Sequence, residues 1–257
     1  MSLKKLVKNV LRKFGYSVYR NDQGPVYDED GLISFHNHDF MNDPSFVAAY
    51  QRGTKAGSGV DSRFHWRVHV ALWAAYCASK LKGDFVECGV NKGVISSAIM
   101  QYLNWNALDK NFYLLDTFNG IDERFVTEEE RRQGKIEINQ SVLASGGYER
   151  NVDAVKQNFS EWQRVCVIQG AVPETLPQVR TEAVAYLHID MNCSIPEQEA
   201  ADYFWPRLVA GALMLLDDYA YKEYGSQKAA MDRFAEGKGV TVLTLPTGQG
   251  LIVKPPL

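Results

Sequence analysis

The sequence has no long apolar run and little cysteine. Its 257 residues include only four cysteines, Cys77, Cys88, Cys166 and Cys193, and none of them forms a Cys-x-x-Cys pair. We therefore expect no disulfide framework and interpret the cysteines as buried thiols in a reducing cytoplasm. No apolar run approaches the roughly 20 residues that a membrane-spanning helix needs.

A strong excess of charge of either sign is also missing. The net charge is −3, with 46% hydrophobic and 23% charged residues. This balance is ordinary for a globular protein with a full-sized core, and it gives no support to nucleic-acid binding. The length fits one large α/β domain with an additional segment.

Acidic residues are absent from the N-terminus up to Asp22, and residues 1–20 carry six positive charges, which leaves −9 on the remainder. Apolar residues recur here every three or four positions, which predicts a basic amphipathic helix over residues 1–14 that ends at Gly15. Such a helix suits the anionic inner surface of a membrane. It would also suit packing on the domain or on a second copy of the chain in a homo-oligomer. It is not a signal peptide, because no continuous apolar core or cleavage site follows.

The third glycine of a dinucleotide fingerprint is missing from the most informative stretch, DFVECGVNKG at residues 84–93. A short apolar strand ends there in an acid and two glycines, and a helical pattern follows. The glycines let the backbone approach a ligand, and the helix offers free N–H groups. An acid before the turn suits a cationic amino-acid end better than a pyrophosphate. The candidates for binding a cofactor are therefore Glu87, Gly89, Gly93 and Ser96, although such turns also occur without a ligand.

Strand-like runs alternate with helical patterns from residue 84 to the C-terminus. The predicted strands are 84–90, 112–116, 165–168, 184–189, 212–216, 239–245 and 250–254. This alternation predicts an α/β fold with a doubly wound, mostly parallel, seven-stranded sheet that ends in an antiparallel hairpin.

Other segments frame this sheet. We expect residues 21–60 to form an irregular lid region with one helix near 45–52, and the main domain to cover 61–257. Asp61 or Ser62 is predicted to cap a helix that runs to Lys82. Capping boxes are predicted at Thr127–Glu130, inside a long insertion over 117–147, and at Ser194–Glu197, before a helix to Val209. The insertion is either a lid or binding loop, or a solvated excursion.

Acids stand at the carboxyl ends of the predicted strands, where ligands bind in open α/β sheets. Asp116 can accept both hydroxyls of a ribose, unless it is a surface acid that starts a turn. Asp190, Asp217 and Asp218 come from two strands expected to be neighbours, and three such carboxylates would suit a hard divalent cation such as Mg²⁺. Ordinary helix N-terminal and loop acids are the alternative.

Five motifs in this order resemble those of one family over roughly residues 60–255. They are GDFVECGV at 83–90, DTFNG at 116–120, Gly170 with TLP at 175–177, LHID at 187–190, and DDY at 217–219. The chain resembles class I S-adenosylmethionine-dependent methyltransferases of the macrocin O-methyltransferase type.

The resemblance implies a Rossmann-like methyltransferase fold and methylation of a hydroxyl, commonly on a sugar of a natural product or polysaccharide. It implies that Glu87 and the Gly89–Gly93 turn hold the methionine end of the cofactor and that Asp116 holds its ribose. Gly170 and Ala171 would approach its adenine. It also implies a Mg²⁺ ion held by Asp190, Asp217 and Asp218.

One position departs from the family pattern, which continues Asp190 as Asp-x-Asp with the second Asp a candidate general base. This chain has Asn192 there, and an amide cannot accept a proton at neutral pH. Asp190 and Asn192 are thus the candidate catalytic positions, with the base left open between the metal alone and another residue. We expect a Mg²⁺-assisted O-methyltransferase with a sugar-containing small-molecule or glycan acceptor. The alternatives are a catalytically silent S-adenosylmethionine-binding protein at a membrane surface, and a nucleotide-sugar or dinucleotide enzyme.

Overall fold

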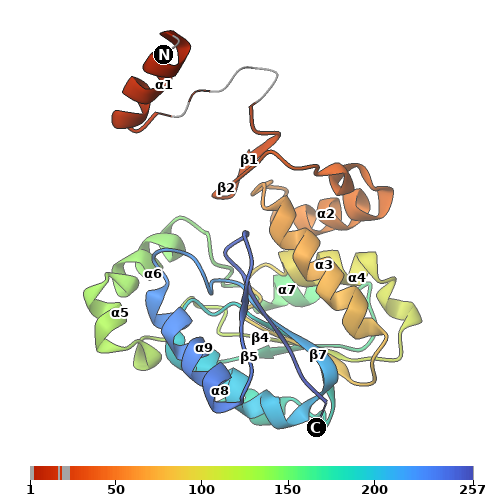
Figure 1. Cartoon of the computed structure of the whole chain (residues 1–257). Coiled ribbons are helices and arrows are strands. Elements are labelled where there is room, and N and C mark those ends of the chain that lie inside the picture. The colour runs from red at the N-terminus through yellow and green to blue at the C-terminus, as the bar shows by residue number, and fades with distance from the viewer. Residues whose placement is uncertain (1–2, 17, 19–23, 257) are drawn as a thin grey trace. The chain divides into compact units, whose positions relative to one another are not determined.

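The computed structural model describes residues 3–16, 18 and 24–256, and it divides into two compact units between Asp39 and Phe40 (Figure 1). The first unit contains helix α1 (Leu3–Lys13) and an antiparallel hairpin of β1 (Tyr27–Glu29) and β2 (Leu32–Ser34). Helix α1 confirms the helix predicted over 1–14 in its described part, and residues 1 and 2 lie outside that part. Gly15 ends it at a φ of 82°. The sequence does not predict the hairpin, because three-residue strands are too short to show alternation.

The second unit is built on a parallel sheet with an antiparallel edge. The strands, in chain order, are β3 (Asp84–Cys88), β4 (Phe112–Asp116), β5 (Val165–Gln169), β6 (Val184–Ile189), β7 (Leu208–Leu216), β8 (Leu243–Thr244) and β9 (Gly250–Val253). Within the described residues they form one seven-stranded sheet in the order β5-β4-β3-β6-β7-β9-β8. β9 pairs antiparallel with β7 and with β8, whereas the other pairs are parallel. The predicted fold class is confirmed.

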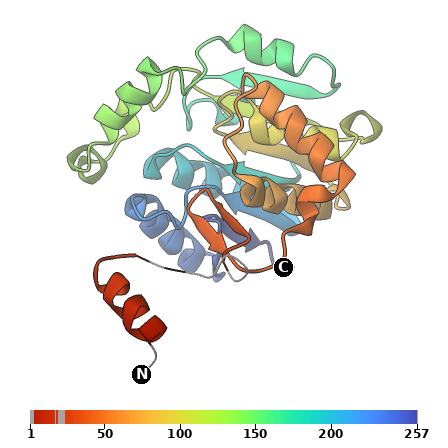
Figure 2. The same cartoon turned by 90° about the horizontal axis from the view of Figure 1, so that it is seen from above.

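Helices cover both faces of this sheet, so it is doubly wound (Figure 2). The α-helices of the second unit are α2 (Pro44–Ala56), α3 (His65–Ser79), α4 (Val94–Tyr102), α5 (Glu128–Arg132), α6 (Lys135–Ala144), α7 (Val152–Asn158), α8 (Ser194–Phe204) and α9 (Gly225–Gly237). Short 3₁₀ helices lie at η1 (Asp39–Asn42), η2 (Trp105–Ala107), η3 (Glu123–Phe125), η4 (Leu176–Gln178) and η5 (Trp205–Arg207). No helix in the described part of the chain is long and apolar enough to cross a bilayer.

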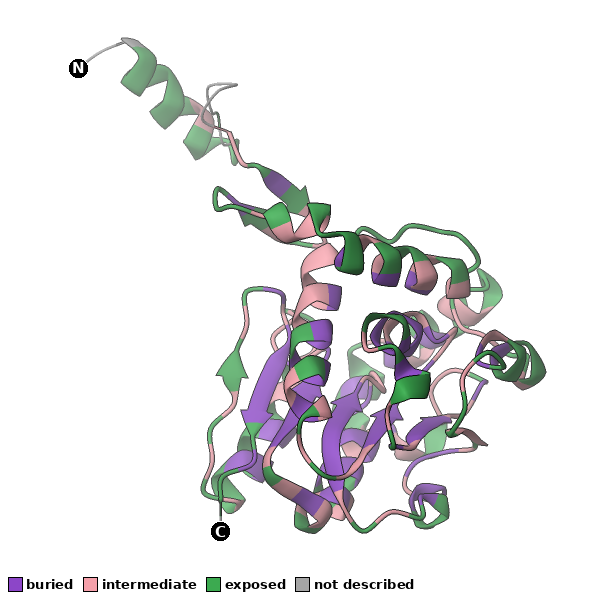
Figure 3. Cartoon of the chain, turned by 90° about the vertical axis from the view of Figure 1, so that its right-hand side faces the viewer, coloured by how far each residue is buried: buried purple, intermediate pink, exposed green. Residues whose placement is uncertain are grey.

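The strands of the sheet are mostly buried (Figure 3). Two hydrophobic cores lie on opposite faces of this sheet. In β3, Phe85 belongs to the core under α2, α3 and α4, whereas Val86 belongs to the core under α8 and α9. In β4, Leu114 and Leu115 divide in the same way. Successive side chains of a strand point to opposite faces, so continuous apolar strands supply both cores at once.

Helix α3 begins later than the sequence predicts. The predicted caps, Asp61 and Ser62, do not cap it, because the helix begins at His65 with Phe64 at the N-cap. The Asp61 carboxylate instead accepts hydrogen bonds from the N–H of Arg63, at 2.8 Å, and from the hydroxyl of Tyr50. A local turn thus takes the carboxylate that a cap would use. The helix ends at Ser79 rather than Lys82.

Of the two predicted capping boxes, the one at Thr127–Glu130 is confirmed and the one at Ser194–Glu197 is wrong. Cys193 is the N-cap of α8, and no side chain caps it. The N–H of Ser194 donates to Glu130 Oε1 at 2.8 Å, so a residue 64 positions away supplies the acceptor. Helix α8 also ends early, at Phe204, because Trp205 and Pro206 begin a 3₁₀ turn. The strand predicted at 239–245 shortens to Leu243–Thr244.

Candidate active site

Neighbouring strands bring the predicted acids to one rim of the sheet. Cys88, Ile189 and Leu216 lie side by side in register at the ends of β3, β6 and β7. The ladder continues by one residue, since the N–H of Asp190 donates to the Cys88 carbonyl at 2.8 Å and that of Asp217 to the Ile189 carbonyl at 2.9 Å. Both acids therefore lie just beyond the carboxyl ends of adjacent strands, where open α/β sheets bind ligands.

The turn after β3 requires glycine for packing. Gly89 has a φ of 94°, and a Cβ there would lie 1.7 Å from the carbonyl oxygen of Asp190. Gly93 has a φ of 79°, and a Cβ there would meet the ring of Phe159 at 2.4 Å. These glycines let the turn after β3 pass close to the end of β6 and to Phe159 at the C-terminal end of α7. Their spacing therefore serves the close packing of the rim.

Asp116, at the end of β4, fixes the same turn. Its Oδ2 accepts hydrogen bonds from the N–H groups of Val90 and Asn91, both at 2.8 Å. Its Oδ1 accepts one from the N–H of Phe118 at 2.7 Å and a long one from the hydroxyl of Thr117 at 3.4 Å. The long contact with Thr117 is the weakest of the four. Asp116 thus has a structural role that the sequence does not reveal, and one lone pair of Oδ1 is only weakly engaged.

A buried histidine links two of the predicted site acids. His188 Nδ1 lies 3.0 Å from Glu87 Oε1, and its Nε2 lies 3.6 Å from Asp217 Oδ1. Burial alone would lower the pKa of His188, but the two adjacent carboxylates outweigh it and raise the pKa to about 10. The histidine is therefore a buried cation at neutral pH. The second oxygen of Glu87 is buried with no hydrogen-bond partner among the described residues.

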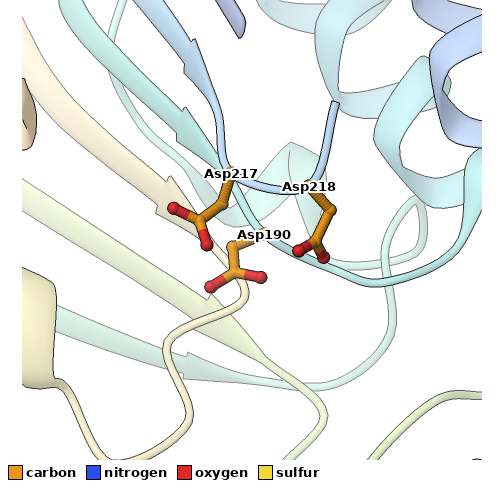
Figure 4. A group of neighbouring side chains, drawn as sticks. All are labelled: Asp190, Asp217 and Asp218. Atoms are coloured by element: carbon orange, nitrogen blue, oxygen red, sulfur yellow. The ribbon is translucent and has the colours of Figure 1, made fainter. Parts of the chain in front are cut away.

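Asp190, Asp217 and Asp218 gather around one point (Figure 4), and one carboxylate oxygen from each lies within 4.8 Å of the others. Burial and the neighbouring Asp217 raise the pKa of Asp218 to about 7, and the same causes raise the pKa of Asp190. Oδ2 of Asp218 is buried without a hydrogen-bond partner in the part of the chain that the structure describes. Three neighbouring carboxylates that repel one another form a set of hard oxygen donors of the kind that Mg²⁺ prefers.

Asp217 differs from the other two aspartates because it has partners. Arg67, on α3, donates to its Oδ2 at 2.7 Å, and Gln249, beside β9, donates to its Oδ1 at 2.9 Å. Burial alone would raise the pKa of Asp217, but Arg67, His188 and Gln249 lower it well below its ordinary value. Asp217 therefore stays ionised and anchors the cluster. The sequence gives no sign of Arg67 or Gln249, which lie 150 and 32 positions away from it.

Two cavities meet at this rim. The first, of about 100 Å³, is lined by residues that include Asp116, Gly170, Ala171 and Asn192. The second, of about 470 Å³, is lined by residues that include Glu87, Arg67 and Asp217. Both cavities are lined by Gly89, Asn91 and Asp190. The walls of these two cavities thus include seven of the predicted cofactor and metal residues, namely Glu87, Gly89, Asp116, Gly170, Ala171, Asp190 and Asp217. Asp218 lines neither cavity, although its carboxylate is close to those of Asp190 and Asp217.

Two of the predicted cofactor residues, Gly93 and Ser96, line neither cavity. Ser96 is fully buried in α4, and its hydroxyl has no partner among the described residues. The structure therefore gives Ser96 no direct access to a ligand in either cavity. Ser96 was predicted to bind the cofactor because it lies near the start of the helix that follows the turn. Its side chain instead lies on the face of α4 that packs into the protein.

Asn192 lies on the wall of the first cavity in the left-handed conformation, with a φ of 58°. Its Oδ1 accepts a hydrogen bond from the hydroxyl of Tyr224 at 2.9 Å. Tyr148 lines the same cavity, and burial together with nearby aspartates raises its pKa to about 12. Its phenol therefore stays protonated at neutral pH. Neither Tyr148 nor Tyr224 stands out in the sequence.

The insertion over 117–147 contributes to the wall of the first cavity through residues that include Asp122 and Phe125. Glu130, which is fully buried, links the insertion to the start of α8. It accepts hydrogen bonds from Thr127 within the insertion and from Ser194 at the start of α8. The insertion is therefore a fixed wall of the site in this structure, rather than a solvated excursion.

Comparison with known proteins identifies the family of this chain. A family model described as macrocin-O-methyltransferase matches residues 67–244, which is more than half of the chain. The chain belongs to the macrocin O-methyltransferase family. The resemblance seen in the five sequence motifs is confirmed.

Individual relatives of this methyltransferase are distant. A curated relative from Streptomyces olivaceus, 8-demethyl-8-(2,3-dimethoxy-alpha-L-rhamnosyl)-tetracenomycin-C 4'-O-methyltransferase, is 26% identical over 149 residues. That match covers 56% of this chain and 55% of the relative, so the chain matches about half the length of that protein.

Solved structures show the same fold. The O-methyltransferase NovP has a TM-score of 0.63 at 18% identity, covering 74% of this methyltransferase and 79% of NovP. The calicheamicin methyltransferase CalS11 has a TM-score of 0.56 at 17% identity, covering 91% of this methyltransferase and 99% of CalS11. At these identities the likeness establishes the fold, and the chemistry of the site must be argued from its residues.

Proposed function

We propose that this methyltransferase transfers the methyl group of S-adenosylmethionine to a hydroxyl of a sugar-containing acceptor, with the assistance of Mg²⁺. The observation that carries the proposal is the single rim on which Glu87, Asp116 and the three clustered aspartates converge around Gly89. Family membership supports the reaction type, and the geometry of the rim supports the division of roles among the residues.

The two cavities suggest how the cofactor lies. Glu87 lines the second cavity, and one of its carboxylate oxygens is buried with no hydrogen-bond partner among the described residues, which suits the cofactor's ammonium group. Asp116, Gly170 and Ala171 line the first cavity, which suits the ribose and adenine. We propose that the cofactor crosses between them past Gly89. A ribose hydroxyl would replace the long Thr117 contact on Asp116 Oδ1, while the bonds from Asp116 to Val90 and Asn91 keep the turn in place.

The three aspartates fit a divalent cation. Asp190, Asp217 and Asp218 supply hard oxygen donors, and Oδ2 of Asp218 has no hydrogen-bond partner among the described residues. A bound Mg²⁺ ion would neutralise the cluster and lower the pKa of a hydroxyl that it contacts. Arg67 and Gln249 hold the Asp217 carboxylate in place, so only the lone pairs that they leave are open to a metal.

The protein's own part in the reaction is positioning. S-adenosylmethionine supplies a methyl group that is already activated by its sulfonium, so transfer needs an oxygen aligned with that methyl and a route for the lost proton. Asp190 lines both cavities, and we propose that it stands between the cofactor and the acceptor. The Asn192 side chain is neutral, and its Oδ1 accepts a hydrogen bond from the hydroxyl of Tyr224. We therefore assign Asn192 a role in shaping the cavity rather than in accepting the proton.

Rhamnose-like sugars are the acceptors that we favour. The name of the Streptomyces relative places its methylation on a rhamnosyl group of a tetracenomycin. CalS11 is described as a TDP-rhamnose 3'-O-methyltransferase. In this chain, the lining of the larger cavity includes Thr54, Ser62 and Phe64, together with Arg67. Hydroxyls and an aromatic ring together suit the polar edges and apolar faces of a deoxysugar.

A methyl-transfer assay tests this proposal. Protein is incubated with methyl-labelled S-adenosylmethionine and either TDP-rhamnose or a methyl rhamnoside, with Mg²⁺ or with a chelator. We expect label on the sugar oxygen only when Mg²⁺ is present. Asp218→Asn should lower transfer by at least about a hundredfold while changing the affinity for S-adenosylhomocysteine less than about tenfold. Asp153→Asn, the same change on the exposed face of α7, is the control and should change neither.

Three results would contradict parts of the proposal. Transfer that persists in chelator would exclude the role of Mg²⁺. Label that appears on another class of acceptor would exclude the sugar. Tight cofactor binding without transfer to any hydroxyl would favour a catalytically silent binding protein, the alternative that the neutral Asn192 supports.

A further inference from the structure

Helix α1 has two chemically distinct faces. Each residue of an α-helix turns by about 100°, which places Leu6, Val7, Val10 and Leu11 within an apolar arc of about 140°. The five basic residues occupy the rest of the circumference together with Asn9, and none of them falls inside the apolar arc. These basic residues are Lys4, Lys5, Lys8, Arg12 and Lys13.

The apolar face of α1 is exposed to solvent in the structure. Leu6, Val7 and Val10 are 46%, 48% and 46% exposed, and Phe14, just past the helix end, is 74% exposed. Side chains of this kind rarely stand together in contact with water unless the surface binds something. The helix is also short, at 11 residues, and a short helix needs a partner surface to stay folded.

We propose that α1 binds the surface of an anionic lipid bilayer, lying parallel to it with the apolar face among the acyl chains and the basic face toward the headgroups. This inference goes beyond the proposed reaction and does not depend on it. Six positive charges over residues 1–20, with no acid before Asp22, are complementary to anionic headgroups. The apolar arc supplies the insertion that charge alone does not provide.

The charge distribution also selects this occupant over others. A second copy of α1 would bring basic residues against basic residues, because no acid lies in the segment to pair with them. Nucleic-acid phosphates would engage the basic face but leave the apolar face in water. The remaining chain carries −9, so it is repelled by an anionic surface, and binding would have to come from the N-terminal segment.

A pair of neighbouring substitutions separates insertion from charge attraction. Val10→Asp places an acid in the middle of the apolar arc, and Asn9→Asp places the same acid on the polar face one residue away. Both lower the net charge by the same amount, and valine and asparagine have similar helix propensities. The full-length protein and both variants are sedimented with vesicles of phosphatidylcholine alone and of phosphatidylcholine mixed with phosphatidylglycerol.

We expect the wild type to bind the anionic vesicles at least about tenfold more tightly than the neutral ones. Asn9→Asp should weaken binding by about fivefold, the effect of one charge, and Val10→Asp by on the order of fiftyfold. The affinity of all three proteins for S-adenosylhomocysteine should be the same, and this would show that the second unit, which carries the candidate active site, is folded in each of them.

Each other outcome overturns the proposal. Equal losses in the two variants would show attraction by charge without insertion. Binding that is equal on neutral and anionic vesicles, or absent from both, would exclude an anionic lipid partner. A dimer in solution that Val10→Asp dissociates would assign the apolar face to a second copy. A loss of S-adenosylhomocysteine binding in Val10→Asp alone would show that α1 packs on the second unit instead.

Discussion

Asn192 is the residue at which this chain departs from the pattern that its motifs resemble, and its surroundings show what the departure does. The amide accepts a hydrogen bond from Tyr224 and lines the first cavity, beside a cluster of three aspartates. A fourth carboxylate here would add repulsion to a cluster in which burial and like charge already raise the pKa of Asp190 and of Asp218. An amide keeps the shape of the wall without that charge.

Restoring an acid at this position tests whether the missing base limits the reaction. Aspartate tolerates the left-handed backbone found at Asn192, so Asn192→Asp should fold normally. If proton removal is limiting, the variant should transfer methyl groups about tenfold faster or more at neutral pH. The control is Asn192→Gly, which tolerates the same backbone, removes the amide without adding a base and should leave the rate within about threefold. A rate for Asn192→Asp equal to that of the wild type would show that this position is not where the proton is lost.

Single residues could be predicted from the sequence where they end apolar strands. Asp116, Asp190, Asp217 and Asp218 stand there, and the topology places them on one rim. Their partners could not be predicted, because Arg67 and Gln249 reach Asp217 from distant parts of the chain. The hydrogen bonds of Asp116 to the turn after β3 and the close packing of Gly89 could not be predicted either, since both depend on how closely two loops approach each other.

Among the elements, the insertion over 117–147 depends on one buried carboxylate. Glu130 accepts hydrogen bonds from the N–H and hydroxyl of Thr127 and from the N–H of Ser194. Burial alone would raise the pKa of Glu130, but these hydrogen bonds outweigh it and lower the pKa. The stabilisation is therefore present above the pKa of an unfolded glutamate, about 4.3, and is lost as the pH falls through the lower folded value.

Glu130→Gln should lower the free energy of unfolding by about 1–3 kcal/mol at pH 7, because it removes charge-assisted hydrogen bonds from a buried site. The matched control is Glu129→Gln, an exposed neighbour on the same helix whose ion pair with Arg132 should contribute less than about 1 kcal/mol. Urea unfolding at several pH values gives both differences. The Glu130 difference should shrink toward pH 3, and a difference that stays constant with pH would show that its charge is not the cause.

Elements with a clear hydrophobic period were predictable, and their ends were not. The strand-and-helix alternation from Asp84 onward was enough to predict the seven-stranded sheet. The predicted cap at Asp61 failed because a local turn to Arg63 and the hydroxyl of the more distant Tyr50 engage its carboxylate. The predicted cap at Ser194 failed because the distant Glu130 accepts a hydrogen bond from its N–H. The β1–β2 hairpin was missed because each strand has only three residues.

At the scale of the whole molecule, one buried histidine connects the two ligands that the proposal assigns to the rim. His188 touches Glu87, which we assign to the cofactor, and approaches Asp217, which we assign to the metal. Together with Asp190, which lines both cavities, it makes the cofactor and metal positions parts of one arrangement. The central claim is therefore that this rim is an S-adenosylmethionine site and not a dinucleotide site.

Calorimetric titration of the full-length protein with S-adenosylhomocysteine and, separately, with NADH tests that claim most directly, because it needs no knowledge of the acceptor. We expect S-adenosylhomocysteine to bind at one site per chain, with Glu87→Gln weakening it at least about tenfold through loss of the charge that faces the ammonium group. NADH should give no binding heat under the same conditions. Saturable binding of NADH with no response to S-adenosylhomocysteine would contradict the account.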